Sequence, residues 1–353
     1  MDCSRLPKVE LHLHLDGSLS FTAVSRLDPS VALPDYQRDF ILPAKCQDMA
    51  EFFARAPRGS TLMQTKEQLR LVTFDVFEQL QRDNVLYAEI LLFPYLHTNR
   101  GLSAESVVEI VDEAVAQANQ ETGIEARIIL SVLRHYPTQQ SLATVKLVER
   151  FKGTRVVGID LGGYEAAYPL FAHIPAFQYA VQHGIPRTVH AGEMLGAESV
   201  WSALKHLQPS RIGHGVRSIE DPDLLAHLRK EQLHLEVCPT SNVQLDLYET
   251  YAHHPLNSFY EAGMAVSVST DTRTMTNVTL TQEYERLHQV FGWQEEHFFR
   301  CNLNAIRAAF LSEDMKQRLE QRLRAGYGLH NRYAHPVFGS SSPVYGRSGA
   351  SHP

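Results

Sequence analysis

Short apolar runs rich in Val, Ile and Leu recur along the whole chain. Runs of this length and composition are typical of buried strands that are covered on both faces. Eight of them can be marked: Val9–Leu15, Val85–Phe93, Ala126–Leu133, Val156–Leu161, Arg187–Ala191, Arg211–His214, Leu233–Cys238 and Ala265–Thr270. We therefore expect eight buried strands.

Most of these runs are separated by stretches in which polar and apolar residues have helical spacing. Examples are Ala104–Gln120, Gln140–Arg150, Pro175–His183 and Asp221–Glu231. A chain that alternates strands with helices builds parallel βαβ units, and eight such units close into one barrel. The sequence thus predicts an α/β protein with a single (β/α)8 TIM barrel.

Two regions are larger than a plain barrel needs. Residues 21–84 separate the first two predicted strands and have the pattern of several helices, so we expect a helical lid inserted on the active face. Residues 282–329 are expected to be helices that pack the closing end of the barrel. The barrel domain would cover residues 1–334, and residues 335–353, rich in Ser, Gly and Pro, are expected to be a disordered tail.

Composition narrows the classes of function. The formal net charge of −7 argues against nucleic acid as the main partner, because phosphate binding requires a basic surface. No apolar run approaches the roughly 20 residues of a membrane helix, so no membrane association is expected. The four cysteines form no C-x-x-C pair, and the first residues lack the apolar segment of a secretory signal, which favours a cytoplasmic protein.

Histidines and carboxylates gather where the predicted strands end, and a β/α barrel places its chemistry at these ends. They are His12, His14, His190, Glu193, His214 and Asp271. Each has an ordinary explanation when taken alone, such as a core histidine, a turn histidine, a solvated loop glutamate or a helix N-cap aspartate. Their coincidence at strand ends favours one shared site.

The residue types point to metal chemistry. His12 and His14 are two apart on a strand, so both face the same side. Three imidazoles and one carboxylate suit zinc, and also iron or another divalent ion. The strand Val156–Leu161 contains no lysine that could bridge two metals, so a single-metal site is expected. A carboxyl group such as that of Glu193, in a dry pocket beside the metal, can stay protonated and act as an acid.

Six ordered motifs resemble the adenosine deaminase family. They are Leu6–Ser18, Gly158–Gly163, Thr188–Glu193, Arg211–Gly215, Cys238–Asn242 and Ser269–Asp271. The resemblance extends from about residue 6 to residue 330. It implies a (β/α)8 barrel that hydrolyses adenosine, and usually 2′-deoxyadenosine, to inosine and ammonia in purine salvage.

The resemblance also implies roles for single residues. Zinc, one ion per chain, would be bound by His12, His14, His190 and Asp271. A zinc-activated water would attack C6 of the purine, and Glu193 would protonate N1. His214 would hold and deprotonate this water and stabilise the developing charge. Glu236 would orient His214 from behind.

Substrate contacts follow by the same similarity. The base and ribose would meet His14, Asp16, Gly163 and Thr272, with the Gly163 amide donating to N3 and Asp16 accepting from the 5′-hydroxyl. Animal members of the family usually have a second aspartate that contacts N7 where this chain has Thr272, so affinity or base selectivity is expected to differ. Apolar lid residues over the ribose would be Met49, Phe52 and Phe53, although ordinary helix packing explains these three nearly as well.

Alternative functions stay open at this point. One is deamination of another 6-aminopurine, namely adenine, a modified nucleoside or 5′-deoxyadenosine. Another is a non-catalytic nucleoside-binding barrel, although such a scaffold has no need of a complete set of ligands, acid and base. In every case the expected partner is a small purine compound.

Overall fold

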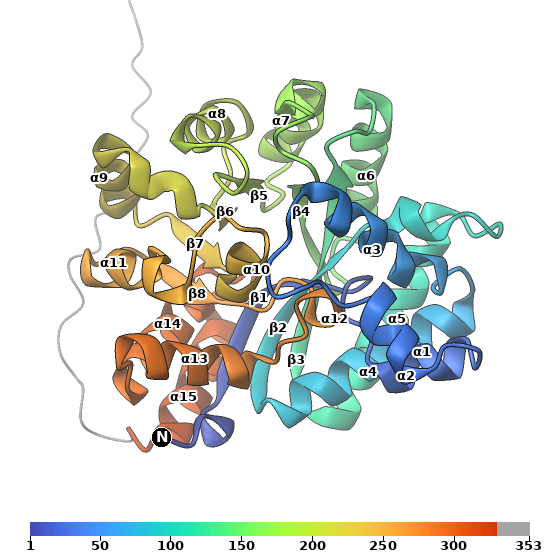
Figure 1. Ribbon diagram of the computed structural model, residues 1–353. Coiled ribbons are helices and arrows are strands. Elements are labelled where there is room, and N and C mark those ends of the chain that lie inside the picture. Colours follow the sequence, from blue (N-terminus) through green and yellow to red (C-terminus); the bar gives the residue numbers. More distant parts are fainter. Residues whose placement is uncertain (330–353) are drawn as a thin grey trace, which may run out of the picture.

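Strands and helices alternate along residues 1–329, the part of the chain that the computed structural model describes (Figure 1). The strands are β1 (Lys8–His14), β2 (Val85–Leu92), β3 (Glu125–Leu133), β4 (Val156–Gly162), β5 (Thr188–Ala191), β6 (Arg211–His214), β7 (His234–Val237) and β8 (Val266–Val268). Each matches one of the apolar runs to within about two residues at either end. All eight predicted strands are thus confirmed.

The strands form two parallel sheets of four, in the orders β1-β2-β3-β4 and β5-β6-β7-β8. Isolated parallel bridges connect the edges of the two sheets. Ile159 on β4 pairs with Arg187 just before β5, and Leu13 on β1 pairs with Asp271 just after β8. The α/β class and the parallel arrangement are therefore confirmed, and the carboxyl ends of all the strands open on the same side.

Helices surround the strands in Figure 1. They include α5 (Ala104–Thr122), α6 (Thr138–Arg150), α7 (Ile174–Gln182), α8 (Ala197–Leu207), α9 (Pro222–Glu231) and α11 (Leu256–Glu261), and four of these are the helices expected from the sequence. On β1, Leu11 and Leu13 are completely buried in the hydrophobic core. The apolar side chains of β1 thus pack in the core, and the alternate side chains, His12 and His14, face the other side of the strand.

The predicted insertion is helical, as expected: α1 (Phe21–Leu27), α2 (Leu33–Asp39), α3 (Met49–Thr61) and α4 (Lys66–Arg82). The side chain of Asp48 accepts a hydrogen bond from the Ala50 amide and starts α3. Met49 and Phe52 pack on a small apolar cluster, made of Leu42, Cys46, Leu245 and Met275, that is separate from the main core. Near the other end of the helix, Gly59 lies against Asp16, since a Cβ at position 59 would be 1.8 Å from the Asp16 carbonyl oxygen.

The C-terminal helices are α13 (Leu280–Phe291), α14 (Glu295–Ala308) and α15 (Glu313–Gly326), which confirms the helical expectation for this region. Two short helices, α10 (Pro239–Gln244) and α12 (Arg273–Thr276), follow β7 and β8. The expected tail, residues 335–353, lies outside the described residues. Within residues 1–329 no helix combines the length and the apolar character needed to cross a bilayer.

Candidate metal and acid–base site

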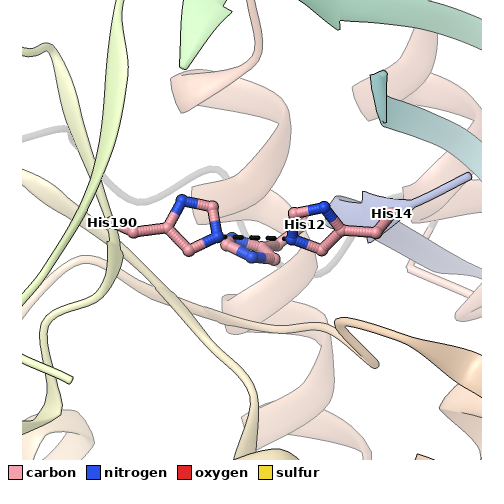
Figure 2. A group of neighbouring side chains, drawn as sticks. All are labelled: His12, His14 and His190. Atoms are coloured by element: carbon pink, nitrogen blue, oxygen red, sulfur yellow. Dashed lines mark hydrogen bonds between the residues drawn. The ribbon is translucent and has the colours of Figure 1, made fainter. Parts of the chain in front are cut away.

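Three histidine rings from two distant strands point at one another (Figure 2). His12 and His14 extend from β1, and His190 extends from β5. The Nε2 atoms of His14 and His190 are 3.3 Å apart. Asp271, just after β8, places Oδ1 3.3 Å from His14 Nε2 and 3.7 Å from His12 Nε2. The four side chains therefore converge on one small volume at the carboxyl ends of the strands.

This geometry fits a divalent cation. Two ligand atoms that are each about 2.0 Å from a tetrahedral ion lie about 3.3 Å from each other, which is the His14–His190 separation. Nε2 of His12 is buried and has no hydrogen-bond partner among the described residues. A buried ring nitrogen without a partner is costly unless a ligand satisfies it. The donor set of three imidazoles and one carboxylate is one that zinc accepts.

Residues outside the ligand set, here called outer partners, orient the side chains of these ligands by hydrogen bonds. Nδ1 of His190 lies 2.9 Å from Asp160 Oδ1, and Ser241 Oγ donates to Asp271 Oδ2 at 2.6 Å. Because a carboxylate can only accept, Nδ1 of His190 carries a proton, which leaves Nε2 as the ring nitrogen that can bind a metal. No role was expected for Asp160 or Ser241 from the sequence, although an aspartate within the apolar β4 is a signal of a functional position.

Glu236 behaves differently from the prediction. It was expected to orient His214, but its Oε2 lies 2.9 Å from Nδ1 of His12, while Asn242 is the partner of His214 Nδ1. The strand register explains the difference, because Glu236 pairs with Gly213 rather than with His214. Gly213 has no side chain, and a Cβ there would come within 3.0 Å of the His12 ring. The glycine thus leaves the His12 ring the room to lie beside Glu236.

Glu193 and His214 lie beside the four candidate ligands His12, His14, His190 and Asp271, which we call the metal-ligand cluster. Their Oε1 and Nε2 atoms are 3.6 Å apart. Burial raises the pKa of Glu193 to about 7, so much of this carboxyl group is protonated at neutral pH. His214 and Asp271 have left-handed backbones, with φ of 58° and 65°. Such strain in residues other than glycine is typical of functional sites.

The loop that carries Glu193 is held by a second glutamate, Glu165. This side chain is 2% exposed and accepts hydrogen bonds from the main-chain amides of residues 192–195, at 2.8 to 3.2 Å. It also accepts from Ser199 Oγ. On the other side, Arg134 donates to the His190 carbonyl at 2.7 Å. No sequence pattern pointed to Glu165, which follows Gly163 by two residues in a loop.

Replacing Glu165 with glutamine should loosen this loop. The amide NH2 group cannot accept from main-chain amides, so we expect a loss of about 1–3 kcal/mol in the free energy of unfolding. We also expect faster hydrogen exchange of the amides of residues 192–195. Urea denaturation and exchange mass spectrometry would measure both. Glu198→Gln is the control, because within residues 1–329 the exposed Glu198 accepts only from the Gly196 amide; equal effects of the two substitutions would contradict the role of Glu165.

A cavity of about 700 Å³ opens above the metal-ligand cluster. The substrate residues named from the sequence all line it: His14, Asp16, Gly163 and Thr272, together with Glu193, His214 and Asp271. Met49, Phe52 and Phe53 of α3 line it as well, and their function as a lid stays a prediction. The structure therefore brings these residues, which were named from the sequence, to one cavity.

Two of the cavity residues have features that suit a polar ligand. Asp16 is half-buried, its buried Oδ1 has no hydrogen-bond partner among the described residues, and desolvation raises its pKa to about 6. Gly163 has a φ of 97°, which favours glycine, and a Cβ at this position would lie 3.3 Å from the Arg134 nitrogen. Its main chain can therefore approach a ligand closely.

Known proteins resemble this chain over most of its length. A family model described as adenosine deaminase matches residues 7–325. An adenosine deaminase of Enterococcus faecalis is 35% identical over 329 residues, which cover 92% of this chain and 97% of the relative. Among solved structures, an adenine deaminase from Arthrobacter aurescens has a TM-score of 0.82 and 28% identity, covering 91% of this chain and 98% of that one. The Arabidopsis protein ADAL, complexed with IMP, has a TM-score of 0.84 and 25% identity, with 94% and 100% covered.

Proposed function

Because this chain belongs to the adenosine deaminase family, we propose that it is a zinc-dependent hydrolase that converts adenosine and 2′-deoxyadenosine to inosine and ammonia. The observation that carries this proposal is the meeting of His12, His14, His190 and Asp271 beside a half-buried Glu193. A purine ligand is supported by the IMP complex of the Arabidopsis protein. We also propose that the two sheets form one closed (β/α)8 barrel, which the bridges at both sheet edges support.

When bound, a zinc ion lowers the pKa of a coordinated water to about 7 and so supplies a nucleophile at neutral pH. The ligands His12, His14, His190 and Asp271 would hold the ion. Their outer partners keep the Nε2 lone pairs of His12 and His190 directed at it.

The protonated carboxyl group of Glu193 would donate to N1 of the purine. Protonation of N1 withdraws electrons from C6, the carbon at which water replaces the amino group, and so makes C6 more electrophilic. The burial that raises the Glu193 pKa keeps this proton available at neutral pH. The Gly163 amide would donate to N3, which fixes the base in the cavity.

Asp16 would accept a hydrogen bond from the ribose 5′-hydroxyl and would repel a 5′-phosphate. A buried like-charge contact costs several kcal/mol, which corresponds to a preference of about 1,000-fold. We therefore expect adenosine and 2′-deoxyadenosine to be turned over, and AMP to be turned over about 1,000-fold less efficiently. The measurement is kcat/KM for each compound, read from the loss of ultraviolet absorbance on deamination.

The same assay tests the proposed function. Adenosine absorbance should fall with the purified protein, should stop falling after a chelator removes the metal, and should fall again once zinc is restored. Adenine and 5′-deoxyadenosine belong in the panel because neither offers Asp16 a 5′-hydroxyl. A faster rate with adenine than with adenosine would reject the nucleoside as the preferred substrate, and no turnover of any 6-aminopurine would reject the enzyme assignment.

A further inference from the structure

A chain of buried hydrogen bonds leads from His214 away from the cavity. Nδ1 of His214 lies 3.2 Å from Nδ2 of Asn242, on α10. The other amide atom, Asn242 Oδ1, lies 3.2 Å from Nε2 of His254, just before α11. Nδ1 of His254 accepts from the Leu256 main-chain amide at 3.2 Å. None of the three side chains is more than 2% exposed, so water does not compete for these contacts.

The last contact determines where the proton of His254 lies. A main-chain N–H can only donate, so Nδ1 of His254 must be the acceptor and carries no proton. Burial lowers the pKa of His254 to about 3, so the ring is neutral and has one proton, which must lie on Nε2. The His254 Nε2–H group therefore donates to Asn242, and the atom that receives it must be the amide oxygen.

The orientation of the Asn242 amide follows from this contact, and it determines the hydrogen bond that His214 receives. With its oxygen turned to His254, the amide presents NH2 to His214 Nδ1, and this group can only donate. We propose that Asn242 and His254 hold His214 in the tautomer whose single proton is on Nε2. This nitrogen is the one that faces the cavity, 3.6 Å from Glu193 Oε1. Asn242 and His254 are thus positioning residues, which act through His214.

The tautomer decides between two roles for His214, and this step rests on the proposed function. A neutral imidazole with hydrogen on Nε2 has no lone pair at that atom, so it cannot take a proton from water there. It can donate a hydrogen bond to an oxygen in the cavity and stabilise the negative charge that develops during attack. The family resemblance implied both roles; the hydrogen bonds favour charge stabilisation over deprotonation of the water.

The protonation pattern can be measured without any turnover. In protein labelled with 15N in its histidines, long-range proton–nitrogen correlation spectra distinguish protonated from non-protonated ring nitrogens. His214→Gln assigns the signal. We expect a non-protonated Nδ1 and a protonated Nε2 for His214 at neutral pH, both with zinc and after chelation. A protonated Nδ1 in the zinc-loaded protein would overturn the proposal.

Asn242→Asp replaces the side-chain amide by a carboxylate of nearly the same size and reverses the direction of the hydrogen bond to His214. A carboxylate can only accept, so it still accepts from His254 but now requires a proton on Nδ1 of His214. We expect the ring to change tautomer and kcat for adenosine to fall by about 100-fold, since outer partners of this kind contribute 10- to 100-fold and a wrong tautomer more. KM should change by about twofold or less, because the ring does not bind the ribose.

The matched control is Asn302→Asp. Asn302 is another buried asparagine, 1% exposed, whose Oδ1 accepts from the Val9 amide and from Tyr284. Its substitution should lower stability but leave the His214 signal and kcat of the folded protein unchanged. If Asn242→Asp moves the proton to Nδ1 and kcat stays the same, the catalytic consequence is wrong. If wild-type protein shows the expected tautomer and deaminates nothing, the proposed function fails while the tautomer assignment stands.

Discussion

Replacing Glu193 with glutamine is expected to lower kcat for adenosine by about 100- to 10,000-fold, the range that a general acid contributes, while the protein still binds its metal. Glutamine has nearly the shape of glutamate but no carboxyl proton to give to N1. Glu193 lies beyond the end of β5 and adjoins the metal-ligand cluster through His214, 3.6 Å away. The substitution does not alter the proposed ligand atoms, which include Nε2 of His14 and His190 and Oδ1 of Asp271.

Three measurements separate chemistry from binding in this variant. Metal content per chain and the affinity for a purine nucleoside without a 6-amino group should match those of the wild type, while kcat falls. Glu198→Gln, on the surface at the start of α8, should have wild-type kcat. Near-normal turnover by Glu193→Gln would show that another group protonates the base.

The positions of the metal-ligand residues could be predicted because they depend on strand periodicity alone. His12 and His14 are two apart on β1, and His190 and Asp271 end or follow apolar runs. Parallel strands bring their carboxyl ends together whatever the details of packing. Their positions at strand ends also placed Glu193 and His214 at this site, whereas the deamination chemistry was implied only by the resemblance to the adenosine deaminase family.

The partners of these residues could not be predicted in the same way. The contact of Glu236 with His12 depends on its pairing opposite Gly213 and on Arg211, which donates to Glu236 Oε1 at 2.6 Å. The position of Glu165 depends on how one loop folds over another, which leaves no periodic signal. Strand register and loop path are set by the whole core, so spacing along the chain does not encode them.

Replacing His12 with alanine is expected to abolish tight metal binding. The ring is fully buried, Glu236 fixes its Nδ1 side at 2.9 Å, and its free Nε2 lies 3.7 Å from Asp271 Oδ1. Alanine removes one of the four proposed ligands and leaves three. The loss of affinity should exceed the 10- to 100-fold that removal of an outer partner such as Glu236 causes, so Glu236→Gln should rank between wild type and His12→Ala.

Competition with a chelator of known affinity, followed by elemental analysis of the dialysed protein, ranks the three proteins by metal affinity. The control is His234→Ala, which removes another buried histidine, one whose Nε2 contacts Ser267 Oγ at 2.8 Å, and leaves the ligand cluster intact. It should lower stability and keep one zinc per chain. If His12→Ala also keeps one zinc per chain after dialysis, the ion is held by other residues, and the deamination chemistry would have to be built around a different centre. If His234→Ala loses its metal as well, the loss would reflect general loosening of the core. Metal loss in His12→Ala would then not identify His12 as a ligand.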